Sequence, residues 1–164
     1  GTLKELGYAD SVVNGVSTNS IGVQYEGRLQ SSDNSVVVGL ATGGTELDLP
    51  GNDGIKFDMD GTTVDLGMRH YYQGFWGGPY ASASLRTIMN PSVTYAGDTD
   101  NYSNPQELVV GGGHKKQFES FLLDFQLGYV LTLSGALKDG STATDSFELE
   151  RDGLEAAASV GIVF

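Results

Sequence analysis

A run of alternating residue types at 121–133 constrains the fold more than any other feature of the sequence. Phenylalanine, leucine or tyrosine stands at every second position, and Asp124, Gln126 and Thr132 are among the residues between them. A period of two predicts a β-strand with one wholly apolar face. At about 3.4 Å per residue the run covers roughly 40 Å, enough for a tilted strand to cross a bilayer. A long strand of a soluble sandwich or barrel shows the same pattern.

Seven further segments repeat the alternation, some more clearly than others. They lie at 3–13, 20–30, 36–42, 64–72, 79–89, 107–116 and 155–164. Within 20–30, for example, Ile21 and Val23 alternate with Gln24 and Glu26. A strand with two such unlike faces separates an apolar environment from a polar one. The sequence therefore predicts eight amphipathic strands.

Composition favours a single all-β domain over residues 1–164. The 24 glycines, set against 4 prolines, indicate tight turns and closely packed strands rather than disorder or a collagen-like repeat. No stretch approaches about 18 consecutive apolar residues, which excludes a transmembrane helix. A chain of 164 residues has the size of one domain.

The acidic balance of the chain excludes several function classes. A net charge of −12 is hard to reconcile with a surface that neutralises phosphates, so no nucleic acid partner is expected. Without cysteine there are no disulfides, thiolate metal sites or cysteine nucleophiles. The acidic stretch GNDGIKFDMDG lacks the ligand spacing of an EF-hand loop. We therefore expect neither a bound metal nor a cofactor.

The connections between the expected strands alternate between short and long. Short ones lie at 31–34, 74–78 and 117–119, and long, acidic ones lie at 43–61, 90–105 and 134–153. If consecutive strands are antiparallel neighbours, all short turns fall at one end and all long loops at the other, as in outer-membrane barrels. Both termini then lie at the short-turn end. The predicted fold is an all-β, eight-stranded antiparallel up-and-down transmembrane β-barrel.

Aromatic residues gather at the predicted short-turn end. They are Tyr72, Phe75, Trp76, Tyr80, Phe118 and Phe121. Such a group is typical of the aromatic girdle at a membrane interface. The alternative is that these rings close the bottom of a soluble barrel.

The segment 155–164 has one apolar face, whose last positions are Val160, Ile162 and Phe164. It resembles the C-terminal signature of bacterial outer-membrane barrels, which the barrel-assembly machinery recognises. The stretches LGMRHYYQGFWGGPYASAS and GGGHKKQFESFLLDFQLGYVL resemble paired strands of small OmpX-like and OmpW-like barrels. In those families an inward arginine precedes aromatic residues at a periplasmic turn, and Arg69 stands in that position. The resemblance implies the bacterial outer membrane.

Charged residues of both signs point into the barrel under this facing of the strands. The expected interior network is Glu26, Arg28, Asp65, Arg69, Arg86, Asp124 and Glu155. The interior of an eight-stranded barrel is just wide enough for side chains to fill. An unpaired buried charge is costly, so we expect ion pairs that plug the lumen rather than a conducting or catalytic interior.

An enzyme built on this barrel requires a histidine together with a serine and an acid. His70 is expected to face lipid, whereas Ser82 and Ser84 on the neighbouring strand face inward, so no triad forms. No catalytic residue is therefore expected. An interfacial role suits the histidine better.

The resulting expectation is a non-enzymatic outer-membrane scaffold that displays acidic extracellular loops for surface interaction or envelope integrity. Its expected partners are outer-membrane lipid and lipopolysaccharide, the barrel-assembly machinery, and an unspecified surface partner. One alternative is a narrow channel for small hydrophobic solutes. A second is a soluble lipocalin-like carrier.

Overall fold

The computed structural model describes residues 2–13, 16–30, 32–48, 56–74, 77–95, 98–135 and 152–163. Over these ranges the backbone forms nine strands, and no helix there is long and apolar enough to cross a membrane. The strands are β1 (Thr2–Val13), β2 (Val16–Arg28), β3 (Asn34–Asp48), β4 (Lys56–Tyr71), β5 (Gly78–Tyr95), β6 (Asp98–Asn101), β7 (Gln106–Phe118), β8 (Phe121–Ser134) and β9 (Gly153–Val163). The all-β class predicted from the alternation is confirmed.

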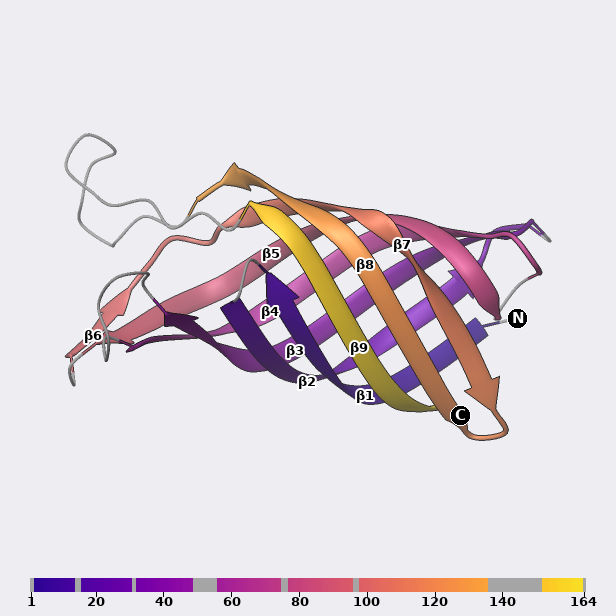
Figure 1. Cartoon of the computed structure of the whole chain (residues 1–164), viewed down its shortest axis with the longest axis horizontal. Helices are drawn as coiled ribbons and strands as arrows, with labels where there is room; N and C mark the ends of the chain where they lie inside the picture. The colour runs from indigo at the N-terminus through magenta and orange to yellow at the C-terminus, as the bar shows by residue number, and fades with distance from the viewer. Residues whose placement is uncertain are drawn as a thin grey trace.

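Eight of the described strands close into a ring, and Figure 1 shows the resulting barrel with its strands tilted. Each pairs antiparallel with the next one along the chain, β5 with β7, and β9 pairs back onto β1. The short β6 pairs with the far end of β5 and lies outside the ring. The predicted eight-stranded antiparallel up-and-down topology is therefore confirmed. Closing a sheet on itself removes the free edges at which other strands pair.

The ring is closed where the first and last strands meet. Their ladder runs without a break from Glu5 opposite Val163 to Val13 opposite Glu155. The ladder between β5 and β7 is equally continuous, from Gly78 to Thr87. Along these ladders the wall leaves no lateral gap.

Three short connections lie at the end of the barrel that also holds both termini (Figure 1). They join β2 to β3, β4 to β5 and β7 to β8, where the sequence predicts short connections. Gly74 has a φ of 98°, a conformation that glycine adopts without strain. The predicted segregation of short connections holds for these three. It fails for β1 and β2, which meet at the opposite end with Val13 paired to Val16.

Two of the three predicted long loops are largely strand. The β3–β4 ladder continues from Gly43 opposite Gly61 to Asp48 opposite Lys56, and β5 continues to Tyr95 beside β6. Backbone that leaves the barrel still needs hydrogen-bond partners, and a longer ladder supplies them. We call residues 43–48, 56–61, 92–95 and 98–101 the projecting sheet, which extends beyond one side of the ring (Figure 1). Most of the third predicted loop lies outside the described residues.

The outer wall carries an apolar belt on seven strands of the ring, β2 to β5 and β7 to β9. Its members are exposed and alternate with inward residues; they include Ile21, Val23, Tyr25, Val38, Leu40, Leu66, Met68, Leu85, Val110, Phe125, Leu127, Tyr129, Leu131, Leu154, Val160 and Ile162. Leu127 is 70% exposed, whereas Leu122 and Val130 on the same strand are buried. An apolar surface of this extent requires a partner other than water. A bilayer is the partner that fits such a belt on the wall of a barrel.

Apolar side chains also fill parts of the interior. Val109 on β7 and Val130 on β8 stand opposite each other and are buried together. Farther toward the turns, Gly113 leaves space for a larger neighbour, because a Cβ atom there would lie 2.5 Å from the hydroxyl oxygen of Tyr80. The glycine-rich run in β7 thus admits an aromatic ring into a narrow barrel.

Candidate functional site

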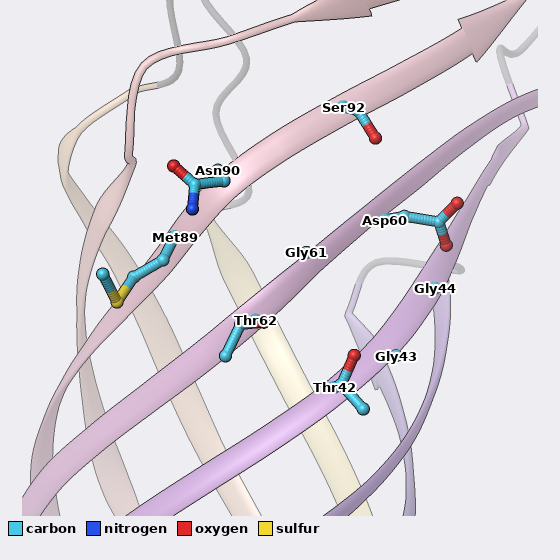
Figure 2. Close-up of a pocket in the computed structure, with 9 residues that line it drawn as sticks. All are labelled: Thr42, Gly43, Gly44, Asp60, Gly61, Thr62, Met89, Asn90 and Ser92. Carbon is cyan, nitrogen blue, oxygen red and sulfur yellow. The ribbon is translucent and has the colours of Figure 1, made fainter.

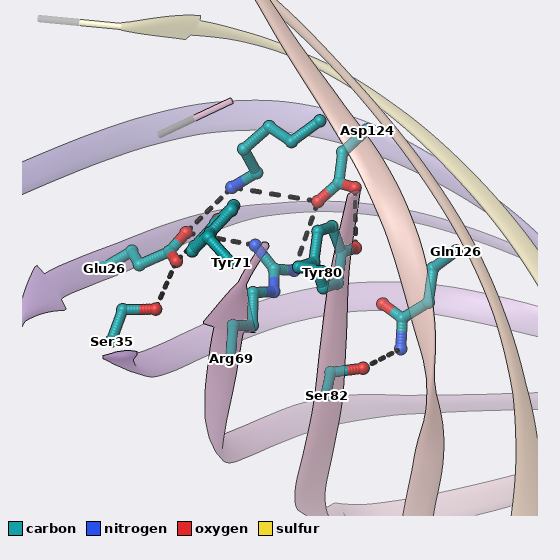
Figure 3. Close-up of polar contacts among 9 residues, drawn as sticks. Glu26, Ser35, Arg69, Tyr71, Tyr80, Ser82, Asp124 and Gln126 are labelled. Carbon is teal, nitrogen blue, oxygen red and sulfur yellow. Dashed lines mark hydrogen bonds and ion pairs between the residues drawn. The ribbon is translucent and has the colours of Figure 1, made fainter. Parts of the chain in front are cut away.

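Seven polar side chains meet inside the barrel near its short-turn end, and Figure 3 shows how they converge. They come from six strands, and each alternates with outward residues of its own strand, so the period of two turns all of them inward. We call them the turn-side cluster: Glu26, Ser35, Arg69, Tyr71, Tyr80, Lys115 and Asp124. Every one of these side chains is buried.

Glu26 on β2 is the most heavily bonded member. Its Oε2 atom lies 3.1 Å from Nη1 of Arg69 and 2.8 Å from Nζ of Lys115. Its Oε1 atom accepts hydrogen bonds from the hydroxyls of Ser35, at 2.5 Å, and Tyr71, at 2.8 Å. Two cations and two hydroxyl donors therefore replace the water that this carboxylate loses on burial.

Asp124 on β8 completes the cluster. Its Oδ2 atom lies 3.2 Å from Nη2 of Arg69 and 3.8 Å from Nζ of Lys115, and its Oδ1 atom accepts a hydrogen bond of 2.7 Å from Tyr80. The guanidinium of Arg69 also lies 4.7 Å from the centre of the Tyr80 ring. Two carboxylates and two cations balance, so the cluster is electrically neutral and closely bonded.

A second group lies toward the other end of the barrel, around Arg86 on β5. Its Nη1 and Nη2 atoms bond the two oxygens of Glu155 at 2.8 and 3.1 Å. The same guanidinium lies 3.2 Å from Asp65 and 3.6 Å from Glu107. We call these four residues the mouth-side cluster. The side chain of Asp65 is 29% exposed, so water reaches this cluster but not the turn-side one.

Hydroxyl and amide groups occupy the space between the two clusters. Nε2 of Gln126 on β8 lies 3.4 Å from the hydroxyl of Ser82 on β5 (Figure 3). Among the described buried side-chain atoms, Nε2 of Gln24 has no hydrogen-bond partner. At the mouth, Asp152 accepts a hydrogen bond from the backbone N–H of Thr132, and this bond lowers the pKa of Asp152.

The structure places six of the seven predicted network residues in these two clusters, and Arg28 is the exception. Arg28 ends β2, and its side chain is 33% exposed. Its Nε atom donates to the carbonyl of Ser32 at 2.7 Å, and Nη2 lies 4.0 Å from Asp33. The last residue of a strand lies at the rim of the barrel, so this arginine contacts the β2–β3 turn.

Sequence reasoning missed Lys115 and Glu107, both inward on β7 and both buried. The facing of β7 was readable from Leu108 and Val110, which point outward. Gly111 to Gly113 interrupt the strand with three residues that have no side chain to mark a face. If the alternation of inward and outward residues is continued through these three glycines, Lys115 falls on the inward face.

Part of the predicted aromatic girdle lies on the outer wall, as the prediction requires. Tyr72, Phe118 and Phe121 are 64%, 45% and 59% exposed near the turns. Tyr80 was wrongly assigned to the girdle: it is only 2% exposed, because Ala81 takes the outward position and the hydroxyl of Tyr80 reaches Asp124. The predicted residues Phe75 and Trp76 lie outside the described residues.

In the predicted assembly signal, Val160 and Ile162 lie on the outward face of β9 and are half exposed, whereas Phe164 lies outside the described residues.

His70 also faces outward. Its Nδ1 atom is 2.8 Å from Oδ1 of Asn34, and its ring meets Tyr72 edge-to-face with centroids 5.1 Å apart. The wall separates this histidine from Ser82. No group of three metal-ligating side chains occurs in the part of the chain that the structure describes.

No protein-family model and no curated protein sequence matches the chain. Solved structures do share its architecture. A major outer membrane protein from Thermus thermophilus has a TM-score of 0.62 at 14% identity over 99% of both chains. The N-terminal β-barrel domain of Pseudomonas aeruginosa OprF has a TM-score of 0.55 at 17% identity, covering 99% of this chain and 97% of that one. The fold is that of the outer-membrane β-barrels.

A third structure agrees with this result. Ail, the attachment invasion locus protein of Yersinia pestis, has a TM-score of 0.51 at 15% identity and covers 99% of this chain and 97% of its own. At such identities the likeness concerns the fold. Together with the apolar belt it agrees with the location predicted from the sequence, the bacterial outer membrane.

Proposed function

We propose that the chain is a non-enzymatic scaffold of the outer membrane, whose sealed barrel anchors an acidic surface outside the cell. The observation that supports this most directly is the ion pair between Glu26 and Lys115, at 2.8 Å. Their strands, β2 and β7, stand four strands apart in either direction around the eight-stranded ring. The pair therefore bridges opposite walls, and Arg69 and Asp124 fill the space beside it.

The interior argues against both alternative functions. A narrow channel for hydrophobic solutes needs an open lumen or a gap in the wall, whereas the turn-side cluster crosses the lumen and the closing ladders are continuous. A lipocalin-like carrier keeps an apolar cup inside and a polar surface outside. Here the charges are inside and the apolar belt is outside.

The projecting sheet supplies the acidic surface. By the register of its strands, one face carries Glu46, Asp48, Asp58 and Asp60 together with Lys56, and the opposite face carries Asp98 and Asp100. In this proposal the sheet has no resident metal ion but shares divalent cations with lipopolysaccharide phosphates, and it is open to a surface partner. The barrel-assembly machinery reads the last strand, at Val160, Ile162 and Phe164.

Neutralising the acidic surface tests this function. The triple variant Glu46→Gln, Asp48→Asn, Asp58→Asn removes three carboxylates from one face of the β3–β4 ladder. Reconstituted in phosphatidylcholine vesicles, it is predicted to retain purified lipopolysaccharide at least tenfold less well in Mg²⁺ than the unmodified protein, because the cation bridge is lost. The control Asp33→Asn removes a carboxylate from the short-turn end and leaves retention unchanged. EDTA, which removes the bridging cation, abolishes the difference in retention between the triple variant and the unmodified protein. Equal retention by the triple variant in Mg²⁺ would contradict the proposed role.

A further inference from the structure

A hollow of about 420 Å³ lies on the outer wall where β3, β4 and β5 leave the apolar belt (Figure 2). Its lining residues are Thr42, Gly43, Gly44, Asp60, Gly61, Thr62, Met89, Asn90 and Ser92. Thr42, Thr62 and Met89 form one row across the three strands. They share the outward face of Leu40 and Leu85, which are 50% and 51% exposed in the belt below. The hollow thus marks the border between the belt and the projecting sheet.

A β-bulge in β5 shapes this hollow. Thr62 stands opposite Met89 and Asp60 opposite Ser92, so Asn90 and Pro91 together oppose Gly61. Two hydrogen bonds to the segment 102–104 fix the bulge. The backbone N–H of Asn90 donates to Oδ1 of Asn104, and the backbone N–H of Tyr102 donates to the carbonyl of Pro91, both at 2.9 Å. Such bulges bend a strand and redirect its side chains. The hollow is therefore built into the backbone.

The lining chemistry suits a neutral, hydroxyl-rich ligand. Hydroxyls of Thr42, Thr62 and Ser92 both donate and accept hydrogen bonds, Asn90 adds an amide, and Asp60 adds an acceptor. The nine lining residues include no lysine or arginine, so a phosphate or sulfate group would meet only the charge of Asp60. A sugar offers many hydroxyls and an apolar C–H face. Met89, 41% exposed, provides an apolar contact at the lower edge.

We propose that this hollow binds a sugar of an outer-leaflet glycolipid. The position of the hollow selects a lipid-linked sugar, because the belt continues directly below it and acyl chains attached to a sugar held there would lie along Leu40, Leu66 and Leu85. A pocket of this volume falls within the ordinary range for small-ligand sites, roughly 300 to 1,000 Å³. This inference rests on the proposed outer-membrane location, but it does not require the cation-bridged contact of the projecting sheet.

Binding of rough lipopolysaccharide in EDTA tests the proposal. The unmodified barrel in phosphatidylethanolamine vesicles retains the glycolipid, and the variants Thr42→Val/Thr62→Val and Asn90→Gly bind it at least tenfold more weakly. Glycine accepts the φ of 50° at position 90 without strain. The control Thr87→Val removes a hydroxyl from β5 below the hollow and binds as the unmodified protein does. Heat-dependent gel migration verifies that each variant is folded.

Two results would overturn the proposal. One is unchanged glycolipid binding by both folded variants in EDTA. The other is equally tight binding of the deacylated core oligosaccharide, which would make the ligand a free saccharide rather than a membrane lipid. The cation-bridged contact is measured in Mg²⁺ with separate variants, so either inference can fail while the other stands.

Discussion

Arg69 is the residue on which the turn-side cluster depends. Its planar guanidinium bonds Glu26 through Nη1 and Asp124 through Nη2, and it lies over the ring of Tyr80. A lysine ammonium is a point charge and cannot hold two carboxylates in this forked geometry. Lys115 contacts the same two carboxylates, but its distance to Asp124 is 3.8 Å. The arginine is therefore the rigid connection between β2, β4 and β8.

Replacing Arg69 by alanine is predicted to destabilise the barrel by about 3 to 5 kcal/mol, because it leaves two buried carboxylates with one cation. The matched control is Arg28→Ala, whose exposed ion pair at 4.0 Å contributes at most about 1 kcal/mol. Urea unfolding in vesicles, followed by gel migration, measures both. Equal losses for the two variants would mean that the interior pairs do not stabilise the barrel.

At the scale of the element, β8 shows how alternation assigns a strand to its two environments. Phe125 and Leu127 face outward at 57% and 70% exposure, and Gln126 between them reaches Ser82 inside. Leu122 and Asp124 continue the inward row. One strand therefore contributes to the apolar belt and to the sealed interior at once.

Arginine introduced at Phe125 or Leu127 is predicted to cost about 2 to 4 kcal/mol, as expected for a cation near the bilayer midplane. Gln126→Asn, on the inward face, is the comparison and costs less, because its hydrogen bond to Ser82 is long at 3.4 Å. Unfolding free energies in vesicles distinguish these positions. Similar tolerance at Phe125 and Gln126 would show that the facing of β8 is reversed.

The barrel could be predicted from the sequence wherever one face of a strand is apolar, since a period of two then fixes the facing of every residue. Glu26, Arg69 and Asp124 were located in this way. The projecting sheet was missed although Phe57 and Met59 alternate with Asp58 and Asp60, because the glycine and aspartate residues around them favour a loop. Tyr80 was misplaced because an aromatic residue near a turn suits either the girdle or a narrow interior, and only the room left by Gly113 decides between them.

At the scale of the whole molecule, ring closure and interior charge act together. The closed ladders leave no edge along which the barrel wall could separate, and the belt places that wall in lipid. Inside, the mouth-side cluster is open to water, whereas the turn-side cluster is buried. The lumen is thus open to water at the end with the projecting sheet and closed by the turn-side cluster at the end with the short turns.

Planar-bilayer recording tests the sealed barrel most directly. A variant with alanine at Glu26, Arg69, Lys115 and Asp124 removes both cations and both carboxylates together, leaves no unpaired charge in the cluster, and serves as the positive control for an opened lumen. The unmodified protein, shown by gel migration to be folded and inserted, is predicted to give no steady single-channel conductance. Reproducible single-channel conductance through the intact, unmodified barrel would contradict the account.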